Sequence, residues 1–533
     1  MRSTFILSVI LIIVFSCKQD TEQAKDVIIA AEAISIPKQE VKPVYISGET
    51  DDSKAFENLN FLDYTNFYGG EPQGQHIEKD TNSIAISIDS MKRPKIMELM
   101  IFGNKFHNTR VFVTPGDSIK LVLKNDKIIF KGLHADHYNF YLELDSLTNE
   151  FSTIGFKDSF TDYKRRTNEL YQKRNEFFEA YVKSHQVSEE FINQVRAEMK
   201  FEYMYNLIAP RTVSSSLPNV HINNSGSLTS VFENQNINLE DNFLDLKRYF
   251  DDIKIEDFNR PDLIDNDYFK RSLTSLIRNY FTQPEYVAYN EENFEAEIGY
   301  INKNLKGEIA QFAKARVIVD YFEKGFGQDK TTHARLKTEI DNFLKQKSNL
   351  SYIAAVKDIQ EELKVFNFKI PKKILEEKLL TAQGDTIRFK DLIQSKKNSK
   401  FIVFWINKEK FHDDCIRCVD DLWKTQNLKK QLVDDSTEWI YISIAETKQW
   451  YQDLILFKNN LEGISNYKTL GNNMESKMLK YFKVKNINFS KENYIQLPRH
   501  LILDENNSVW YNAVPNVFDI ETFKSLLKKE KSE

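Results

Sequence analysis

The hydrophobic pattern of this chain changes its period twice along 533 residues, and these changes constrain the fold more than any other feature. From Val44 to about Leu133, apolar and polar residues alternate in short runs between turn residues, which is typical of strands. From about Ala135 to Phe366, apolar residues recur every three or four positions, which is typical of helices. The last third mixes both patterns. We therefore expect several domains rather than one core.

The first region is expected to form a small antiparallel β-sandwich. Its strand-like runs are VYISG, NLNFLDY, SIAISID, IMELMIFG, TRVFVTPGDSIKLVL and KIIFKG. Between two of these runs, Pro115, Gly116 and Asp117 predict a turn, because proline fixes φ and glycine can take a positive φ.

The middle region is expected to be all helical. The clearest helical segments are residues 137–151, 162–186, 188–208 and 308–325, and a polar break near residues 212–230 divides the region. Phenylalanine and tyrosine recur along these helices at three- and four-residue spacing. Such stripes could line a ligand groove, but helix packing is the favoured interpretation.

The last third predicts an α/β domain with a central mixed sheet. A strand pair around a Gly-Asp turn is followed by the buried strand KFIVFW and by a helix from about Cys415 to Leu432. After these come a strand, two helices, a hairpin around ENN and a closing helix, formed by EWIYISIA, KQWYQDLILFKNN, NMESKMLKYFKV, RHLILD, SVWYN and DIETFKSLLKKE.

The N-terminus predicts export. Arg2 precedes an apolar run from Phe5 to Phe15, which is short for a membrane span but fits the apolar part of a signal peptide. Ser16 and Cys17 end the run and resemble the lipobox of bacterial lipoproteins, which implies a lipidated Cys17 held by its acyl chains. The alternative is a signal peptide with an incidental cysteine.

The residues after Cys17 bear on location and partners. Lys18, rather than an aspartate, follows the cysteine, which in many didermic bacteria accompanies transport to the outer membrane, and CKQD resembles the surface-export signals of Bacteroidetes lipoproteins. We therefore expect a lipid-anchored protein of the cell envelope, on the outer membrane and facing either periplasm or cell surface. A net charge of −5 without a basic stripe makes nucleic acid an unexpected partner.

Cys415 and Cys418 are two of only three cysteines in the chain. Cys415 is expected at the first turn of a helix, where free N–H groups and the helix dipole favour a thiolate. Cys418 lies three residues on, on the same helical face and close enough to form a disulfide. Two alternatives stay open. The pair could be inert, or it could belong to a zinc site, for which only His412 is nearby.

Residues from about 366 to 533 resemble the thioredoxin fold, and specifically the TlpA/ResA-like thiol-disulfide oxidoreductases. The resemblance rests on GDTIRFKDL, on FIVFW before CIRC, and on LPRHLILDENNSVWY. It implies that Pro498 is a cis-proline facing the cysteine pair. It also implies that Cys415 attacks substrate disulfides and Cys418 resolves the mixed disulfide. Asp421 matches a carboxylate that moves protons to the buried thiol, although it could be an ordinary solvated acid.

The same resemblance gives a substrate-contacting set: Trp405, Ile416, Arg417, Leu497 and Arg499. The sequence also departs from the family. Nine residues, Ile406–Asp414, separate FW from the first cysteine, the usual tryptophan before that cysteine is missing, and Val403 stands where cytosolic thioredoxins hold a buried aspartate. Arg417 favours the thiolate, whereas Asp413 and Asp414 oppose it. The active-site entrance is therefore expected to be rebuilt locally.

The front of the chain also resembles a known unit. VFVTPGDSIKLVL followed by IIFKGLHADHYNFYLEL is similar to the DUF4369-like β-rich domain of Bacteroidetes lipoproteins, which implies no chemistry. The expected organisation is a signal peptide at 1–16, a tether at 17–43, a β-sandwich at 44–134, a helical domain at 135–365 and a thioredoxin-like domain at 366–533.

Together these features predict a membrane-anchored thiol-disulfide oxidoreductase that reduces or exchanges disulfides in cell-envelope proteins. It would need no cofactor beyond the Cys415–Cys418 disulfide and no metal. Its partners would be envelope proteins with thiols or disulfides, an upstream membrane reductant, and the membrane itself through the lipid anchor. The alternative is a redox-inactive binding or scaffold lipoprotein with a thioredoxin-like recognition domain, which the lengthened loop and missing tryptophan favour.

Overall fold

By its contacts, the chain in this computed structural model divides into two units, Met1–Glu40 and Val41–Glu533. The described residues are 41–57, 59–64, 75–79, 82–151, 154, 160–212, 249–282, 291–394, 399–406, 416–432, 437–470, 476–484, 499–514, 521 and 523–526. The predicted signal peptide and Cys17 lie outside them, as does most of the predicted tether. Among the helices of the described residues, none is both long and apolar enough to cross a membrane.

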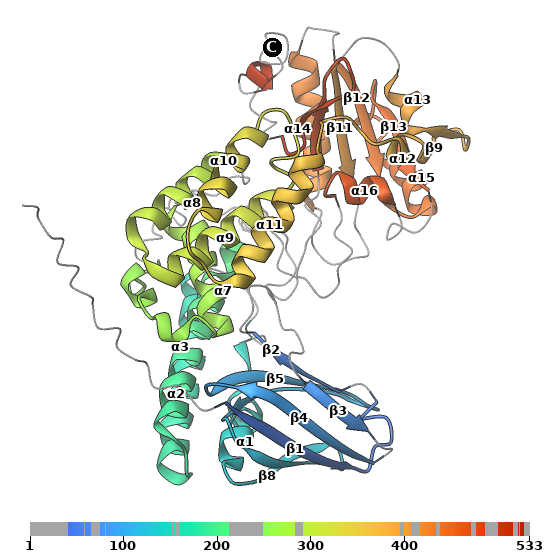
Figure 1. The fold of residues 1–533 in the computed structure, drawn as a ribbon. Coiled ribbons are helices and arrows are strands. Elements are labelled where there is room, and N and C mark those ends of the chain that lie inside the picture. The colour runs from blue at the N-terminus through green and yellow to red at the C-terminus, as the bar shows by residue number, and fades with distance from the viewer. Residues whose placement is uncertain are drawn as a thin grey trace, which may run out of the picture. The chain divides into compact units, whose positions relative to one another are not determined.

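The first region of the second unit forms two sheets (Figure 1). One has the strand order β3-β4-β1-β7-β8 and the other β2-β5-β6. The strands are β1 (Lys42–Thr50), β2 (Leu59–Asp63), β3 (Gln75–Lys79), β4 (Ser83–Met91), β5 (Lys95–Phe102), β6 (Phe106–Val113), β7 (Ser118–Lys124) and β8 (Lys127–Gly132). Alternate side chains of both sheets, such as Ile46 and Leu99, belong to one buried cluster. The finer label of a β-sandwich stays a prediction.

The expectation of purely antiparallel strands is wrong for one pair. β1 pairs with β7 in parallel, with Ile46 opposite Ile119, so the larger sheet is mixed. Alternation in the sequence specifies which face of a strand is buried, but it does not specify the neighbouring strand or its direction. The expected turn is present. Gly116 has a φ of 89°, and the Thr114 N–H donates to Asp117 Oδ2 at 2.8 Å.

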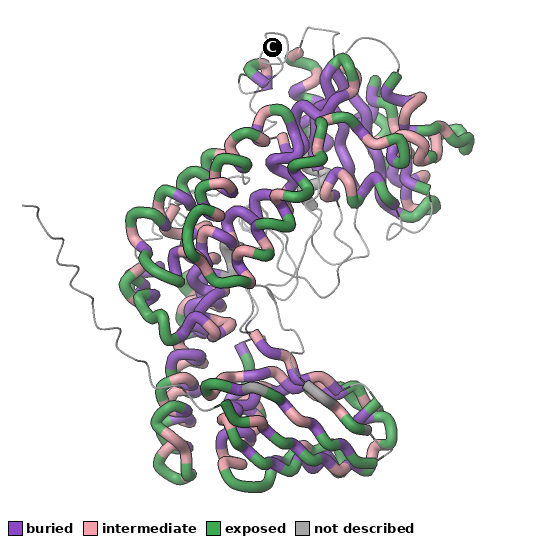
Figure 2. The backbone as a smooth tube through the Cα atoms, in the orientation of Figure 1, coloured by how far each residue is buried: buried purple, intermediate pink, exposed green. Residues whose placement is uncertain are grey.

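The middle region is helical, as expected. Its helices are α1 (Ala135–Thr148), α2 (Phe160–Ser184), α3 (Glu189–Thr212), α7 (Asp267–Leu276), α8 (Glu291–Asn304), α9 (Gly307–Glu323), α10 (His333–Leu344) and α11 (Leu350–Val365), with the short helices η3 (Ile255–Phe258), η4 (Pro261–Leu263) and η5 (Ile277–Phe281). In Figure 2 the buried residues follow the inner sides of these helices. Many aromatic side chains lie in their buried clusters, so packing explains most of the aromatic stripes. Nearly all of the predicted polar break falls outside the described residues.

The last region contains a sheet with the strand order β10-β9-β13-β12-β11-β14-β15. Its strands are β9 (Lys378–Thr381), β10 (Thr386–Arg388), β11 (Ser399–Trp405), β12 (Thr437–Ser443), β13 (Ser465–Thr469), β14 (Arg499–Leu503) and β15 (Val509–Tyr511). The helices are α12 (Lys372–Leu375), α13 (Phe389–Ile393), α14 (Ile416–Gln431), α15 (Thr447–Leu456) and α16 (Lys477–Tyr481). β11, β12 and β13 are parallel, and β14 runs antiparallel to β11, which confirms the predicted mixed sheet.

Strand β11 is buried along its whole length and separates two cores. Ile402 and Phe404 belong to one hydrophobic cluster, and Phe401, Val403 and Trp405 belong to the other. Because side chains alternate along a strand, these are the two faces of the sheet. The continuous apolar run that predicted a buried strand is therefore explained by cover on both faces.

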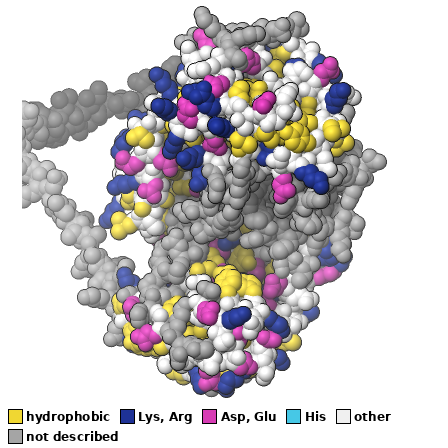
Figure 3. Space-filling view, turned by 90° about the vertical axis from the view of Figure 1, so that its right-hand side faces the viewer, with side chains coloured by type: hydrophobic (Ala, Val, Ile, Leu, Met, Phe, Trp, Pro, Cys, Tyr) yellow, Lys and Arg dark blue, Asp and Glu magenta, His cyan; other side chains and the backbone are white. Residues whose placement is uncertain are grey.

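The surface shown in Figure 3 carries Lys and Arg side chains interspersed with Asp and Glu. This mixture agrees with a chain of 73 basic and 78 acidic residues. The predicted domain boundaries stay predictions.

Candidate functional site

The predicted site residues differ in how much the structure describes. Cys17, Cys415, Leu497 and Pro498 lie outside the described residues. Ile416, Arg417, Cys418 and Asp421 occupy the first two turns of α14, where the helix is described but these side chains are not. Only Trp405 and Arg499 are described completely. The predicted roles of the whole set therefore stay predictions.

Two of these positions lie at one edge of the sheet. β11 ends at Trp405, and the residue before it, Phe404, is the register partner of Arg499 at the start of β14. Because β14 is antiparallel to β11, the end of one strand lies beside the beginning of the other. The sequence between β11 and β12 contains α14, which begins at Ile416.

Trp405 packs in the core on the α14 side of the sheet. Its side chain is 1% exposed, and its ring meets Tyr441 and Phe457 at angles near perpendicular, with centroids 6.4 and 6.3 Å away. Leu422 of α14 is buried in the same cluster. Among the described residues, the buried Trp405 Nε1 has no hydrogen-bond partner. Packing through Leu422 thus holds α14 against the face of the sheet that includes the end of β11.

Arg499 is also buried, with 2% of its surface exposed. Its Nε donates to the Phe482 carbonyl at 3.2 Å, and its Nη1 donates to the Lys324 carbonyl. Its Nη2 is buried without a hydrogen-bond partner among the described residues. Burial lowers the pKa of the guanidinium to about 9, and the charge of Asp329 only partly opposes this shift. The guanidinium is therefore bound by carbonyl groups of the chain itself.

Sequence reasoning missed the segment that meets Arg499. Lys324 follows the last residue of α9, and the backbone between α9 and α10 continues through Gly325, Gly327 and Asp329. Gly325 has a φ of 96°, a conformation that glycine adopts readily and other residues rarely adopt. A glycine after the helix signals that the helix ends, but it does not indicate which distant residue lies there.

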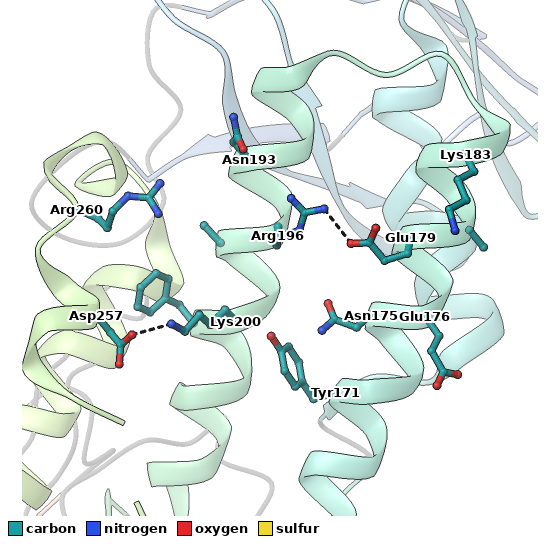
Figure 4. A pocket seen from close by; sticks show the side chains of 13 residues that line it. Tyr171, Asn175, Glu176, Glu179, Lys183, Asn193, Arg196, Lys200, Asp257 and Arg260 are labelled. Atoms are coloured by element: carbon teal, nitrogen blue, oxygen red, sulfur yellow. Dashed lines mark hydrogen bonds and ion pairs between the residues drawn. The ribbon is translucent and has the colours of Figure 1, made fainter. Parts of the chain in front are cut away.

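A separate groove of about 700 Å³ lies in the helical region between α2, α3 and η3 (Figure 4). Two ion pairs join its lining residues, Arg196–Glu179 and Lys200–Asp257, both at 2.8 Å. Tyr171 lines the groove and stacks on Tyr203 with a centroid distance of 4.6 Å. The aromatic stripes therefore contribute little to this groove, which is lined mainly by polar and charged side chains.

Among the described residues, no group of three or more His, Cys, Asp or Glu side chains could hold a metal ion. No protein-family model matches the chain. No curated protein matches it either.

Several solved structures resemble part of the chain. One is the thioredoxin domain of a thiol-disulfide oxidoreductase from Bacteroides vulgatus, at 10% identity and TM-score 0.21, covering 28% of this chain and 91% of that one. An uncharacterized thioredoxin-like protein from Porphyromonas gingivalis matches at 16% identity and TM-score 0.23, covering 30% of this chain and 93% of that one. StoA from Bacillus subtilis matches at 15% identity and TM-score 0.20, covering 28% of this chain and 93% of that one. At these identities and scores, the function must be argued from this chain's own residues.

Proposed function

We propose that residues 366–533 form a thioredoxin-like thiol-disulfide oxidoreductase that uses Cys415 and Cys418 to reduce or exchange disulfides in cell-envelope proteins. The observation that carries the proposal is the register between β11 and β14, which pairs Phe404 with Arg499. The chain enters β14 from Pro498, and it enters α14 from Cys415. Connectivity therefore favours a site built from these two entry points.

The start of α14 supplies a physical reason for a reactive thiol. The N–H groups in the first turn of a helix have no partner within the helix, and they favour a negative charge placed there. Cys415 directly precedes Ile416, the first residue of this helix of 16 residues. A thiolate at this position is the form that attacks disulfides.

The position of Cys418 suits the resolving role. It lies four residues before Leu422, and positions four apart share one helical face. Leu422 is fully buried beside the sheet. By helix geometry Cys418 shares a face with both Leu422 and Cys415, and its place one turn beyond Cys415 fits the thiol that reacts second.

The proposed reaction conserves atoms and electrons. The Cys415 thiolate attacks one sulfur of the substrate disulfide, the S–S bond breaks, and one substrate thiolate leaves. The Cys418 thiolate then attacks the Cys415 sulfur of the mixed disulfide, and the second substrate thiolate leaves. Two electrons pass to the substrate, and Asp421 would take the proton from Cys418. An upstream membrane reductant with a dithiol would restore the pair.

The cellular setting belongs to the same proposal. Lipidation of Cys17 would hold the protein on the outer membrane, facing periplasm or cell surface, after cleavage of residues 1–16. The location suits the chemistry, because disulfides persist outside the cytosol and their exchange needs a thiol pair there.

A trapping experiment tests the redox function. In the full chain, Cys418→Ser should accumulate mixed disulfides between Cys415 and envelope proteins, since the resolving thiol is gone. The matched control is the double variant Cys415→Ser, Cys418→Ser, which should trap nothing. An empty trap for Cys418→Ser, together with no reduction of a model disulfide by the wild type, would rule the proposal out.

The groove between α2 and α3 favours a second candidate, a redox-inactive binding or scaffold lipoprotein. A groove of about 700 Å³, whose charged lining residues are held by two ion pairs, is the kind of site that could hold a partner. This candidate predicts that the double cysteine variant keeps both partner binding and growth phenotype. Loss of either in that variant would favour the redox function instead.

A further inference from the structure

The segment between α9 and α10, residues 324–332, contacts the sheet of the last region at several points. The Lys330 N–H donates to the Val509 carbonyl at 3.3 Å, and Lys330 Nζ lies 2.6 Å from Asp504 Oδ2. The Asn512 N–H donates to Asp329 Oδ2 at 3.2 Å. We name residues 324–332 the α9–α10 loop. It is bound to β15 and to the residues that flank this strand.

Asp329 fixes the conformation of the loop itself. Its carboxylate is completely buried, and its Oδ1 accepts the N–H of Thr332 at 2.8 Å and the hydroxyl of Thr331 at 2.7 Å. Its other oxygen accepts the N–H of Asn512 across the contact with the sheet. One side chain therefore joins the local turn of the loop to the end of β15.

The loop reaches β14 through Arg499. The Lys324 carbonyl accepts from Arg499 Nη1, and the next residue, Gly325, leaves room for the guanidinium. A Cβ at Gly325 would lie 1.7 Å from Arg499 Nη2 and 3.0 Å from Asn512 Nδ2. Real Cβ atoms do not approach so closely, so any side chain at this position must displace the guanidinium or the loop.

We propose that the α9–α10 loop is a clamp through which the helical region sets the position of the start of β14, with Arg499 as the positioning residue. This proposal rests on the proposed function, because Pro498 and the cysteine pair are the residues whose position the clamp is expected to set. Arg499 directly follows Pro498 and is the register partner of Phe404 near the end of β11. Displacing its guanidinium would move this edge of the sheet, and small misplacements of reacting groups cost large factors in rate.

The test uses the full chain and two variants of the clamp. Gly325→Ala introduces the methyl group that collides with Arg499. Arg499→Lys keeps the positive charge but loses the planar fork that reaches two carbonyls at once. The matched control is Gly299→Ala in α8, where an added Cβ meets nothing within 4 Å. Circular dichroism checks that each variant is folded.

Two measurements report on the reactivity of the cysteine pair, which a change in stability alone would not alter. The first is the rate of alkylation of Cys415 by iodoacetamide, and the second is the equilibrium of the cysteine pair with glutathione. Both clamp variants should change the alkylation rate about tenfold and the equilibrium constant about threefold or more, whereas Gly299→Ala should match the wild type.

The outcomes separate the two proposals. If folded clamp variants match Gly299→Ala within about twofold in both readouts, the clamp is wrong. If Gly325→Ala does not fold, Arg499→Lys decides alone. A wild type that reduces no model disulfide and forms no internal disulfide removes the proposed function, and the alkylation rate of Cys415 then decides the clamp by itself.

Discussion

Two arginines, the partly buried Arg110 and the buried Arg499, bind segments far apart in the sequence, and they are held in opposite ways. Arg110 of β6 lies 3.2 Å from Glu198 Oε1 and 3.1 Å from Glu202 Oε2, both of α3. Arg499 of β14 is held by the carbonyls of Phe482 and Lys324, and among the described residues no carboxylate forms an ion pair with it.

The pKa values of the two guanidinium groups follow this difference. Burial lowers the pKa of Arg110, but the charges of Glu202 and neighbouring groups outweigh burial, so the pKa lies well above its usual value. For Arg499, burial dominates and lowers the pKa to about 9. Arg110 is held in place by ion pairs with opposite charges. Arg499 is located by backbone geometry, so its position depends on the conformation of the α9–α10 loop.

The largest expected effect comes from removing Arg110. Arg110→Met leaves the buried Glu198 without a cation and leaves the buried Glu202 with only Arg174, at 3.6 Å, which should cost about 3–5 kcal/mol of unfolding free energy. Arg499→Met leaves only backbone carbonyls unpaired and should cost about 1–3 kcal/mol. Urea unfolding of the full chain measures both. An equal or larger loss for Arg499→Met would contradict the comparison.

The pH dependence of stability isolates the carboxylates that face Arg110. Burial raises the pKa of Glu198 from 4.5 to about 7, with Arg110 opposing and Glu202 adding to the shift. A raised carboxyl pKa in the folded state gives stability that is present below the unfolded pKa and is lost as pH rises through the folded value. As pH rises from about 4.5 to about 7, the unfolding free energy of the wild type should therefore fall by up to about 3 kcal/mol through this group.

The variant Glu198→Gln provides the comparison for this titration, since it cannot ionise. The stability of the wild type minus that of Glu198→Gln should fall as pH rises from about 4.5 to about 7, measured by urea unfolding at fixed ionic strength. A difference that stays constant or grows with pH would show that Glu198 is ionised throughout and fully paired with Arg110.

The substitution Gly325→Ala should have an intermediate effect. Its φ of 96° disfavours alanine, and its methyl group would meet the guanidinium of Arg499. We expect a loss of about 1–3 kcal/mol. Gly299→Ala in α8 should instead stabilise by about 0.5–1 kcal/mol, because alanine favours the helix. Thermal unfolding of the two variants measures both effects, and equal shifts in melting temperature would exclude a clash at Gly325.

The smallest effect is expected for Lys330→Ala. Its side chain is 34% exposed where it meets Asp504, and such partly exposed pairs contribute about 0.5–1 kcal/mol. The loss should shrink further in high salt, because salt screens exposed charges. Urea unfolding at low and high salt checks this, and a loss comparable to that of Arg499→Met would mean that the clamp depends on charge.

Local signals in the sequence predicted much of the fold. The helix expected from about Cys415 to Leu432 is observed as Ile416–Gln431. The apolar run before it is β11, because a strand covered on both faces needs apolar side chains at every position. The α/β order of the last third was readable for the same reason, since period and turn residues are local properties of the chain.

Long-range contacts were not readable in this way. The sequence did not predict the parallel pairing of β1 with β7, and it did not predict the strand β13. Both features depend on which segments meet in space. The contact between Lys324 and Arg499 joins residues 175 positions apart. Arg499 was expected to touch substrate because of its neighbour Pro498. That role stays a prediction, and the structure adds a contact with the helical region that no motif indicates.

The candidate site was located by motif and connectivity. CIRC, the start of α14 and the paired ends of β11 and β14 define the edge of the sheet where chemistry is proposed. The nine residues from Ile406 to Asp414 have no helical or strand pattern, so local rules gave no expectation for how the entrance is built.

The most direct test of the central proposal is to equilibrate the full chain in glutathione buffers of graded ratio and count the free thiols of Cys415 and Cys418 by alkylation and mass spectrometry. Both thiols should disappear together in one two-electron transition, and neither single variant, Cys415→Ser or Cys418→Ser, should show it. If both cysteines stay independently alkylatable at every ratio, they do not form a redox pair and the proposed function is wrong.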